Sequence, residues 1–264
     1  MRPVARVSVI TPERAMASDL PPGLAGTGRA EAYCAGPGRP IHLHLARLAS
    51  QEKLVIGPMA GDCAAYVWQG EVAAGGTGLG AGSSMIVEHG ARLSLTGAGP
   101  GDALVLCFAG TAPATKPGGT VHLLPAAQVP RMAAEPGSSG VSGGLHADSD
   151  CAGCSAWLHE NHFPGGMELT PEQAARGIHS HSEDEIIFVT AGAMRLGARL
   201  VGPGTAIAIA AATLYSFTAG PEGLSFVNFR AAMPGDIRFA HGASISETGY
   251  WRERVGRPVY LSPV

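Results

Sequence analysis

The stretch Gly177-Ile-His-Ser-His-Ser-Glu-Asp-Glu-Ile-Ile-Phe-Val-Thr-Ala-Gly192 decides how the whole chain is interpreted. His179 and His181 are two residues apart, so both imidazoles point to one face if this segment is extended. Glu185 has the same parity and falls on that face if no bulge intervenes. Two imidazoles and a carboxylate on one wall can bind a divalent metal and leave coordination positions open. The apolar run that follows predicts a stiff strand beneath these ligands.

The spacing of these residues resembles the first motif of the cupin superfamily. That motif runs Gly, a spacer, His-x-His, three residues, Glu, six residues, Gly, and this chain matches it from His179 to Gly192. The spacer holds only Ile178, where the family usually has five residues. The second cupin motif has Pro-Gly, an apolar strand and then a histidine. The segment from Pro203 to Phe217 has this layout, with Tyr215 at the histidine position.

The resemblance implies an all-β fold of the double-stranded β-helix or jelly-roll type. It also implies one divalent metal ion (Fe, Mn, Ni or Zn), with His179, His181 and Glu185 as ligands. Tyr215 could ligate the metal through its phenol oxygen, donate a proton or hydrogen bond to a substrate, or only fill the barrel. We favour a pocket-lining role, so Tyr215 is predicted as a catalytic residue and as the fourth candidate ligand.

An internal repeat extends the interpretation to the rest of the chain. Tyr66-Val67-Trp-Gln-Gly70 aligns with Phe188-Val189-Thr-Ala-Gly192 at a shift of 122 residues, and the run 93–108 resembles the run 214–229. Two tandem barrels, a bicupin, are therefore predicted. The same shift places Gly57, Met59 and Cys63 opposite the three ligands. None of them replaces a histidine or glutamate, so the first barrel is predicted to be structural.

Short strand-like runs separated by Gly-rich turns predict the domain division. Residues 1–112 are predicted to form the N-terminal barrel, 113–150 a linker rich in Pro, Gly and Ser, and 151–264 the metal-binding barrel. The second barrel has seven extra residues around 170–177, beside the ligands. This insertion is either a lid or substrate-contacting loop, or a tolerated surface loop.

Composition limits the partners. Lys and Arg number 18 against 21 acidic residues, without a basic cluster, so nucleic acid is not an expected partner. The first residues lack a signal peptide's apolar core. The uncharged run 200–221 is interrupted by Gly and Pro, which favours barrel strands over a membrane helix. Five cysteines without framework spacing indicate a reducing cytoplasm. A homodimer is compatible with the resemblance, because cupins often dimerise.

Other side chains have more than one interpretation. Cys151 and Cys154 form one Cys-x-x-Cys, which could belong to a zinc site, a redox pair or a plain strand entry; a structural zinc site needs four ligands. His159 and Asn161 lie on one face of their strand and His162 on the other, so one of them could contact substrate; alternatively they are surface histidines on an edge strand. Arg230 could bind a carboxylate bidentately if its face is inward. His42 and His44 are interpreted as structural residues. Glu183 is expected at the rim of the site.

The predicted function is a metal-dependent enzyme that acts on a small polar or carboxylate-bearing molecule, in an oxygenase-like way. One alternative is a non-redox Mn or Zn aminohydrolase, lyase or isomerase. The layout is similar to that of the ureidoglycine aminohydrolases, bicupins with a manganese site only in the C-terminal barrel. Their ligand order is Glu-x-His, three residues, His, then Gln, and the order here differs. A second alternative is a ligand-binding cupin without catalysis.

Overall fold

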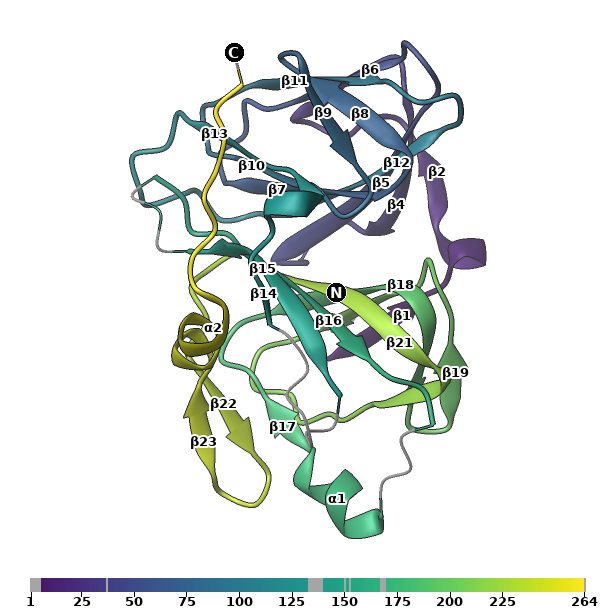
Figure 1. Ribbon diagram of the computed structural model, residues 1–264, viewed down its shortest axis with the longest axis vertical. Coiled ribbons are helices and arrows are strands. Elements are labelled where there is room, and N and C mark those ends of the chain that lie inside the picture. The colour runs from purple at the N-terminus through teal and green to yellow at the C-terminus, as the bar shows by residue number, and fades with distance from the viewer. Residues whose placement is uncertain are drawn as a thin grey trace.

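The computed structural model describes residues 6–36, 38–132, 140–149, 151, 153–166 and 170–263. Two β-barrels lie against each other, the N-terminal one above and the C-terminal one below in Figure 1. The predicted all-β fold with two tandem barrels is confirmed. Helices are few and short: α1 (Pro171–Arg176), α2 (Glu247–Val255) and two 3-10 turns at Pro12–Arg14 and Ala126–Gln128.

The N-terminal barrel has two sheets. The larger follows the order β13-β10-β7-β12-β5-β4-β2, and the smaller the order β3-β6-β11-β8-β9. The larger sheet's strands are β2 (Met16–Ser18), β4 (Arg29–Cys34), β5 (Ile41–Leu48), β7 (Cys63–Gln69), β10 (Ser84–Val87), β12 (Ala103–Gly110) and β13 (Val121–Leu124). The smaller sheet's strands are β3 (Leu24–Gly26), β6 (Lys53–Ile56), β8 (Glu71–Ala74), β9 (Thr77–Gly80) and β11 (Leu93–Gly97).

The C-terminal barrel has a large sheet of order β1-β20-β18-β21-β16-β15-β14, with β19 paired to β18, and a small sheet of order β17-β22-β23. The large sheet's strands are β1 (Val7–Ile10), β14 (Arg131–Met132), β15 (Ser142–Asp148), β16 (Trp157–Phe163), β18 (Glu185–Leu196), β19 (Arg199–Val201), β20 (Ala206–Ile209) and β21 (Thr218–Arg230). The small sheet's strands are β17 (His179–Ser180), β22 (Asp236–Phe239) and β23 (Ser244–Ser246).

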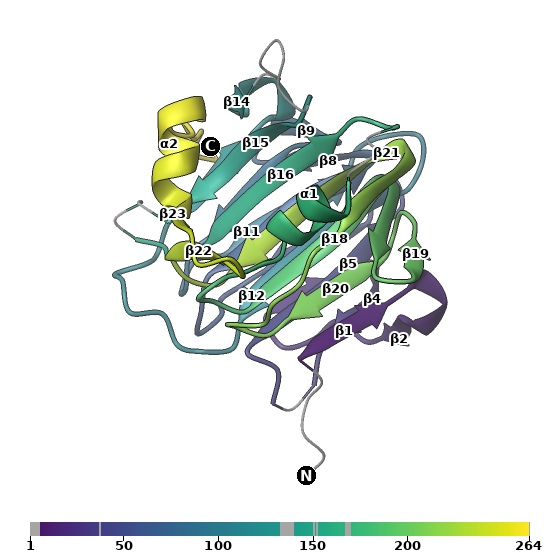
Figure 2. The same cartoon turned by 90° about the horizontal axis from the view of Figure 1, so that it is seen from below.

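The two large sheets pack face to face, which explains why their strands are apolar on both sides. On β18, Ile186 and Phe188 belong to the core between the barrels, whereas Ile187 and Val189 belong to the core inside the C-terminal barrel. Side chains alternate faces along a strand, so an unbroken apolar run is needed when both faces are buried. Figure 2 shows β16, β21, β18 and β20 lying across the strands of the other barrel.

Repeat-related residues meet at this contact between the barrels. Trp68 Nε1 donates a hydrogen bond to the carbonyl oxygen of Thr190 at 3.1 Å, and these residues are 122 positions apart. Phe108 stacks on Phe229 with ring centroids 5.3 Å apart. The aligned strands of the two halves therefore face each other, as expected for two barrels of one repeat.

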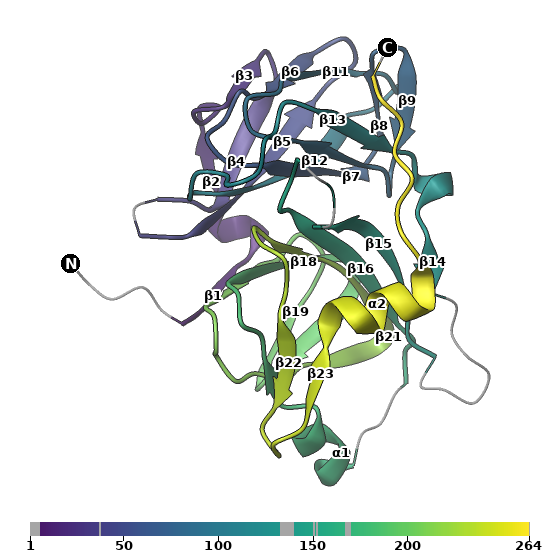
Figure 3. The same ribbon diagram turned by 90° about the vertical axis from the view of Figure 1, so that its left-hand side faces the viewer.

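Both ends of the chain cross to the opposite barrel. Strand β1 pairs with β20, with Val7 opposite Ile209, and Leu261 forms a bridge with Leu123 of β13. Figure 3 shows the tail after α2 running up to the N-terminal barrel. The observed division thus differs from the predicted one: residues 1–112 supply a strand to the C-terminal barrel, and the predicted linker 113–150 contains β13, β14 and β15. Short strands within a Gly- and Pro-rich stretch gave too little periodicity to be recognised.

Two further observations concern localisation. In the described ranges, no helix is both long enough and apolar enough to span a membrane. Cys151 and Cys154 are joined by a disulfide, a pairing that the prediction of a reducing cytoplasm did not include. Cys34, Cys63 and Cys107 are free and buried.

Candidate metal centre

A cavity of about 320 Å³ lies within the C-terminal barrel and contains most of the predicted site. His179, His181 and Tyr215 line it, together with Asn228 and Arg230 from β21. The rest of the wall is largely aromatic and aliphatic. Glu185 is almost completely buried behind this wall, where it contacts Asn228 and Arg230. His179 lies on β17, His181 in the connection after it, Glu185 at the start of β18 and Tyr215 in a bridge to His179, so separate segments bring the predicted residues to one place.

Strand β17 positions His179 directly opposite Tyr215. The two residues form a β-bridge, with the His179 amide donating to the Tyr215 carbonyl at 3.0 Å and the Tyr215 amide donating back at 2.9 Å. Their ring centroids are 4.6 Å apart. His179 Nδ1 lies 2.8 Å from the carbonyl oxygen of Gly177, which can only accept, so Nδ1 carries the proton and Nε2 is free to bind a ligand.

His181 is held by a carboxylate that the sequence analysis missed. Its Nδ1 lies 2.9 Å from Glu247 Oε2, and its Nε2 lies 3.9 Å from Glu185 Oε2. Arg230 Nη2 also lies 3.0 Å from His181 Nδ1, but Nη2 has a carboxylate acceptor of its own, because it donates a hydrogen bond to Glu185. A carboxylate only accepts, so the proton belongs on Nδ1. The His181 Nε2 lone pair then faces Glu185.

Glu185 has one bonded oxygen and one without a partner. Oε2 accepts hydrogen bonds from Asn228 Nδ2 at 2.7 Å and Arg230 Nη2 at 3.0 Å. Oε1 is buried and has no hydrogen-bond partner. Burial alone would raise the pKa of Glu185, but the interactions with His181 and Arg230 and the Asn228 hydrogen bond outweigh it and lower the pKa. Glu185 is therefore a carboxylate with a free oxygen.

Arg230 neutralises two buried acids. Its Nη1 donates to Glu247 Oε1 at 2.6 Å while Nη2 donates to Glu185, and the side chain is 1% exposed. Burial by itself would lower the pKa of Arg230, but the two carboxylates outweigh it and raise the pKa. Arg230 was predicted to bind a carboxylate if its side chain points inward. It does point inward, and the carboxylates that it binds are Glu185 and Glu247 of the protein itself.

The donor set fits a divalent cation. Each imidazole has Nδ1 bonded to an acceptor and Nε2 free, the usual arrangement of metal-binding histidines. Glu185 Oε1 adds an unpartnered buried oxygen.

The ligand atoms of His179, His181 and Glu185 do not all lie within 4.8 Å of one another. Within the described ranges, only Glu88, His122 and Cys151 bring three such atoms within 4.8 Å of one another. An ion in the cavity would draw the His179 ring toward His181 and Glu185.

Tyr215 occupies the place of the missing histidine as a protonated phenol. Burial, followed by the charge of Glu185, raises its pKa well above the ordinary value. Its hydroxyl lies close enough to Glu185 to lower the pKa of that carboxylate. The geometry does not meet the criteria for a hydrogen bond, so Glu185 Oε1 has no partner. The Tyr215 phenol is thus a donor beside the candidate ligands.

Glu247 and Trp251 are the site residues that the sequence analysis missed. Both lie on α2. A local signal existed, because Ser246 followed by an acidic residue is typical of a helix start, and the Ser246 side chain does accept from the Gly249 amide. No spacing rule connects that start to His181, which is 66 residues away.

The neighbouring predictions have separate outcomes. His159 and Asn161 both line the cavity, whereas His162 Nδ1 contacts Ser225 Oγ at 2.9 Å outside it. The insertion forms α1, capped by Thr170, and no residue described in 170–178 lines the cavity. The N-terminal barrel has a cavity of about 560 Å³ lined by His42, His44, Cys63 and Cys107, without a cluster of metal ligands among its described residues.

His159 makes stability depend on pH. Burial lowers its pKa to about 3, and Trp157 Nε1 donates to its Nδ1 at 2.8 Å. An unfolded histidine titrates near pH ~6.5, so below that value the unfolded chain binds a proton that the folded chain does not. We expect the free energy of unfolding of metal-free protein to fall by about 2 kcal/mol between pH 7 and 5 from this residue. His44, whose pKa burial lowers to about 4, acts in the same direction.

Urea titrations of metal-free protein at both pH values measure this dependence. In His159→Gln the loss between pH 7 and 5 should be smaller by about that amount. His162→Gln, which changes a histidine outside the cavity, should keep the wild-type dependence. An unchanged slope in His159→Gln would show that His159 is not held neutral.

Comparisons with known proteins agree with this architecture. No model of a protein family matches the sequence, and no curated protein matches it. Protein Ylba from E. coli is 16% identical, over 85% of this chain and 90% of that chain, with a TM-score of 0.64. A suggested dioxygenase from Nostoc punctiforme is 11% identical, over 91% and 86%, with a TM-score of 0.63. A mutant of oxalate decarboxylase OxdC from Bacillus subtilis is 14% identical, over 90% and 79%, with a TM-score of 0.61.

Identities this low show a shared fold and leave the chemistry to the residues of the site. In each case the structural similarity covers most of both chains. It therefore includes the N-terminal barrel as well as the C-terminal barrel that contains His179 and His181. The chain therefore has the two-barrel fold of the bicupins.

Proposed function

We propose that the C-terminal barrel is a metal-dependent enzyme site for a small polar or carboxylate-bearing molecule. The observation that supports this most strongly is the pair of imidazoles with free Nε2 atoms on the cavity wall, together with the unpartnered Oε1 of Glu185 buried behind that wall. A volume of about 320 Å³ is at the small end of ligand pockets. A small substrate fits that volume.

His179, His181 and Glu185 would hold the ion, with Tyr215 as a fourth donor or as its neighbour. A divalent metal held there would bind and polarise the substrate, and Fe(II) would also activate oxygen. Two histidines and one carboxylate leave open positions like those of non-haem Fe(II) oxygenases, which supports the oxygenase-like proposal. Among proteins of similar fold, the B. subtilis oxalate decarboxylase is described with Mn(II) centres.

The other cavity residues have roles that follow from their contacts. Glu247 fixes the tautomer of His181, and Arg230 keeps Glu185 and Glu247 ionised. Tyr215 keeps its proton at neutral pH because burial raises its pKa, so it can donate to a substrate oxygen. Asn228 Oδ1 has no partner and can accept a hydrogen bond from the substrate. Phe163, Phe217 and Phe226 exclude water from one wall.

A non-redox reaction is the second candidate. A protonated phenol beside a carboxylate can serve a hydrolase, lyase or isomerase without oxygen, because those reactions need a positioned acid. Separate reconstitution with Fe(II), Mn(II) and Zn(II), followed by a panel of small hydroxy, oxo and dicarboxylic acids, distinguishes the two. We expect oxygen consumption with Fe(II). Turnover without oxygen uptake would favour the second candidate, and binding without turnover by any metal would contradict an enzyme.

Tyr215→Phe tests the proton donor. We expect turnover of whichever acid reacts to fall by about 10²–10⁴-fold, the usual contribution of a positioned acid or base. Metal content should be unchanged if the phenol acts on the substrate. Tyr250→Phe is the matched control, because Tyr250 also lines the cavity but its hydroxyl points to Met132. Equal turnover in Tyr215→Phe and wild type would reduce Tyr215 to barrel filling.

A further inference from the structure

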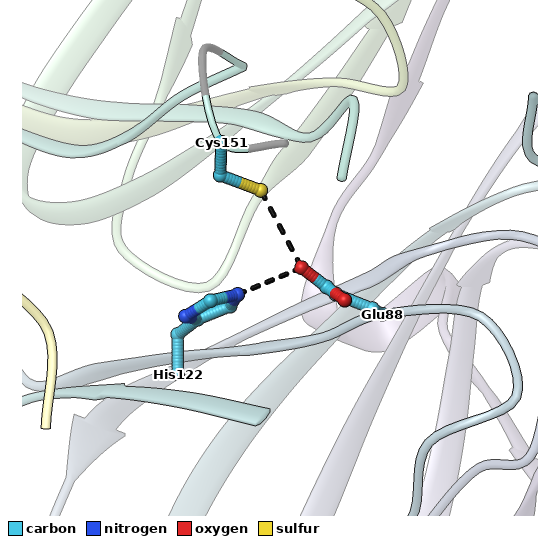
Figure 4. Close-up of side chains that lie close together, drawn as sticks. All are labelled: Glu88, His122 and Cys151. Carbon is cyan, nitrogen blue, oxygen red and sulfur yellow. Dashed lines mark hydrogen bonds and ion pairs between the residues drawn. The ribbon is translucent and has the colours of Figure 1, made fainter. Parts of the chain in front are cut away.

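A second group of metal-binding side chains lies where the barrels meet, outside the cavity. Glu88 follows β10 and His122 lies on β13, both in the N-terminal barrel, while Cys151 precedes β16 of the other barrel. Figure 4 shows the His122 ring and the Cys151 sulfur pointing at one oxygen of Glu88. Residues far apart in sequence thus converge from both barrels.

The distances suit a zinc ion. His122 Nε2 is 2.8 Å and Cys151 Sγ is 3.5 Å from Glu88 Oε1, and all three ligand atoms lie within 4.8 Å of one another. Tetrahedral zinc bonds of about 2.0–2.3 Å place neighbouring donor atoms roughly 3.3–3.6 Å apart. Thiolate, imidazole and carboxylate are the three side-chain ligands of zinc. Only small shifts are needed to seat the ion.

Glu88 is prepared for this role by its surroundings. It is 2% exposed, and the Thr120 amide donates to Oε2 at 2.9 Å, which leaves Oε1 for His122 and Cys151. A buried carboxylate needs compensation, and the His122 imidazole lies 2.8 Å from its Oε1. A cation between the three side chains would supply that compensation.

The cysteine loop is fixed against Glu88. Lys116 Nζ donates to the carbonyl oxygens of Ser149, Cys151 and Cys154 at 2.6, 2.9 and 2.6 Å. A Cβ on Gly153 would lie 2.3 Å from Glu88 Oε1, so any larger residue at this position would require the Glu88 side chain to shift. The loop is therefore built to bring Cys151 to Glu88.

We propose that reduction of the Cys151–Cys154 disulfide creates a zinc site between the barrels, with Glu88, His122 and the Cys151 thiolate as its protein ligands and water completing the coordination. The Cys154 amide already lies 2.9 Å from Cys151 Sγ, where it stabilises a thiolate. Opening the disulfide takes two electrons and two protons, which a phosphine and water supply as the phosphine becomes its oxide. Zinc then replaces the thiol proton of Cys151, which passes to the buffer, while Cys154 keeps its proton.

Cobalt(II) is the probe, because thiolate ligation gives it a near-ultraviolet charge-transfer band that a His and Glu site cannot give. The protein is reduced with tris(2-carboxyethyl)phosphine, desalted without oxygen and titrated with Co²⁺, then with Zn²⁺. We expect the band to saturate near one equivalent and to disappear when zinc displaces cobalt. Protein with the disulfide intact should show no band. Absence of the band in reduced wild type would overturn the proposal.

Variants separate this site from the cavity. Cys151→Ser should abolish the band, and His122→Ala and Glu88→Gln should weaken cobalt binding by about 10-fold or more. His89→Ala is the matched control, because His89 is adjacent in sequence but its ring faces Asp62. His179→Ala, in the cavity, should also leave the band unchanged, so failure here and failure of the proposed function are distinguishable. A band of equal strength in His122→Ala and Glu88→Gln would contradict a site formed by Glu88, His122 and Cys151.

Discussion

Replacing Arg230 with methionine is expected to lower the free energy of unfolding by about 3–5 kcal/mol. The guanidinium is 1% exposed and bonds both Glu185 and Glu247, so its loss leaves two buried carboxylates without a positive partner. Burial then raises the pKa of both acids, and the folded state is penalised unless they take up protons. Urea unfolding of metal-free protein at neutral pH measures the loss.

Two further variants show where that energy comes from. Arg195→Met changes an exposed arginine of β18 and should shift stability by less than about 0.5 kcal/mol. Adding Glu185→Gln and Glu247→Gln to Arg230→Met should restore part of the loss, because neutral side chains do not need the guanidinium. If Arg230→Met alone stays within about 1 kcal/mol of wild type, the three charges are not a coupled buried group.

Replacing His181 with glutamine is expected to have the largest effect on metal affinity. Loss of an outer partner such as Glu247 typically costs 10–100-fold. Loss of the ligand itself should exceed about 100-fold, because Nε2 faces Glu185 and Nδ1 is already committed to Glu247. Titration of metal-free protein with Mn²⁺ or Zn²⁺, followed by calorimetry, measures the change.

His162→Gln is the matched control for that titration. His162 lies on β16 of the same barrel, but its ring contacts Ser225 outside the cavity, so its loss should leave metal affinity unchanged. Equal affinities of wild type and His181→Gln would mean that the ion binds elsewhere. Cys151→Ser should be present in all these proteins, so that only the cavity contributes.

Local spacing in one short segment is the basis for predicting His179, His181 and Glu185 as neighbours. In the structure they lie on β17, in the connection after β17 and at the start of β18, so the alternation of a single strand does not place them. A bridge brings Tyr215 opposite His179. The repeat predicted two tandem barrels, a feature that depends on strand and repeat periods, which the sequence displays directly.

Other features depend on packing between distant segments, which no spacing records. Glu247 reaches His181 only because the tail folds back through β22 and β23 into α2. The pairing of β1 with β20 moves the first strand into the second barrel. Cys151 meets Glu88 and His122 because two barrels meet, and a single Cys-x-x-Cys with two ligands missing gave no sign of them.

Metal content tests the cavity site most directly. Cys151→Ser protein, with and without His179→Ala, is loaded with Mn²⁺ or Fe²⁺, desalted and measured by elemental analysis. We expect about one equivalent of metal per chain in the first protein and almost none in the second, because the His179 Nε2 would be lost. Equal metal in both proteins, or none in either, would contradict a metal centre at His179, His181 and Glu185.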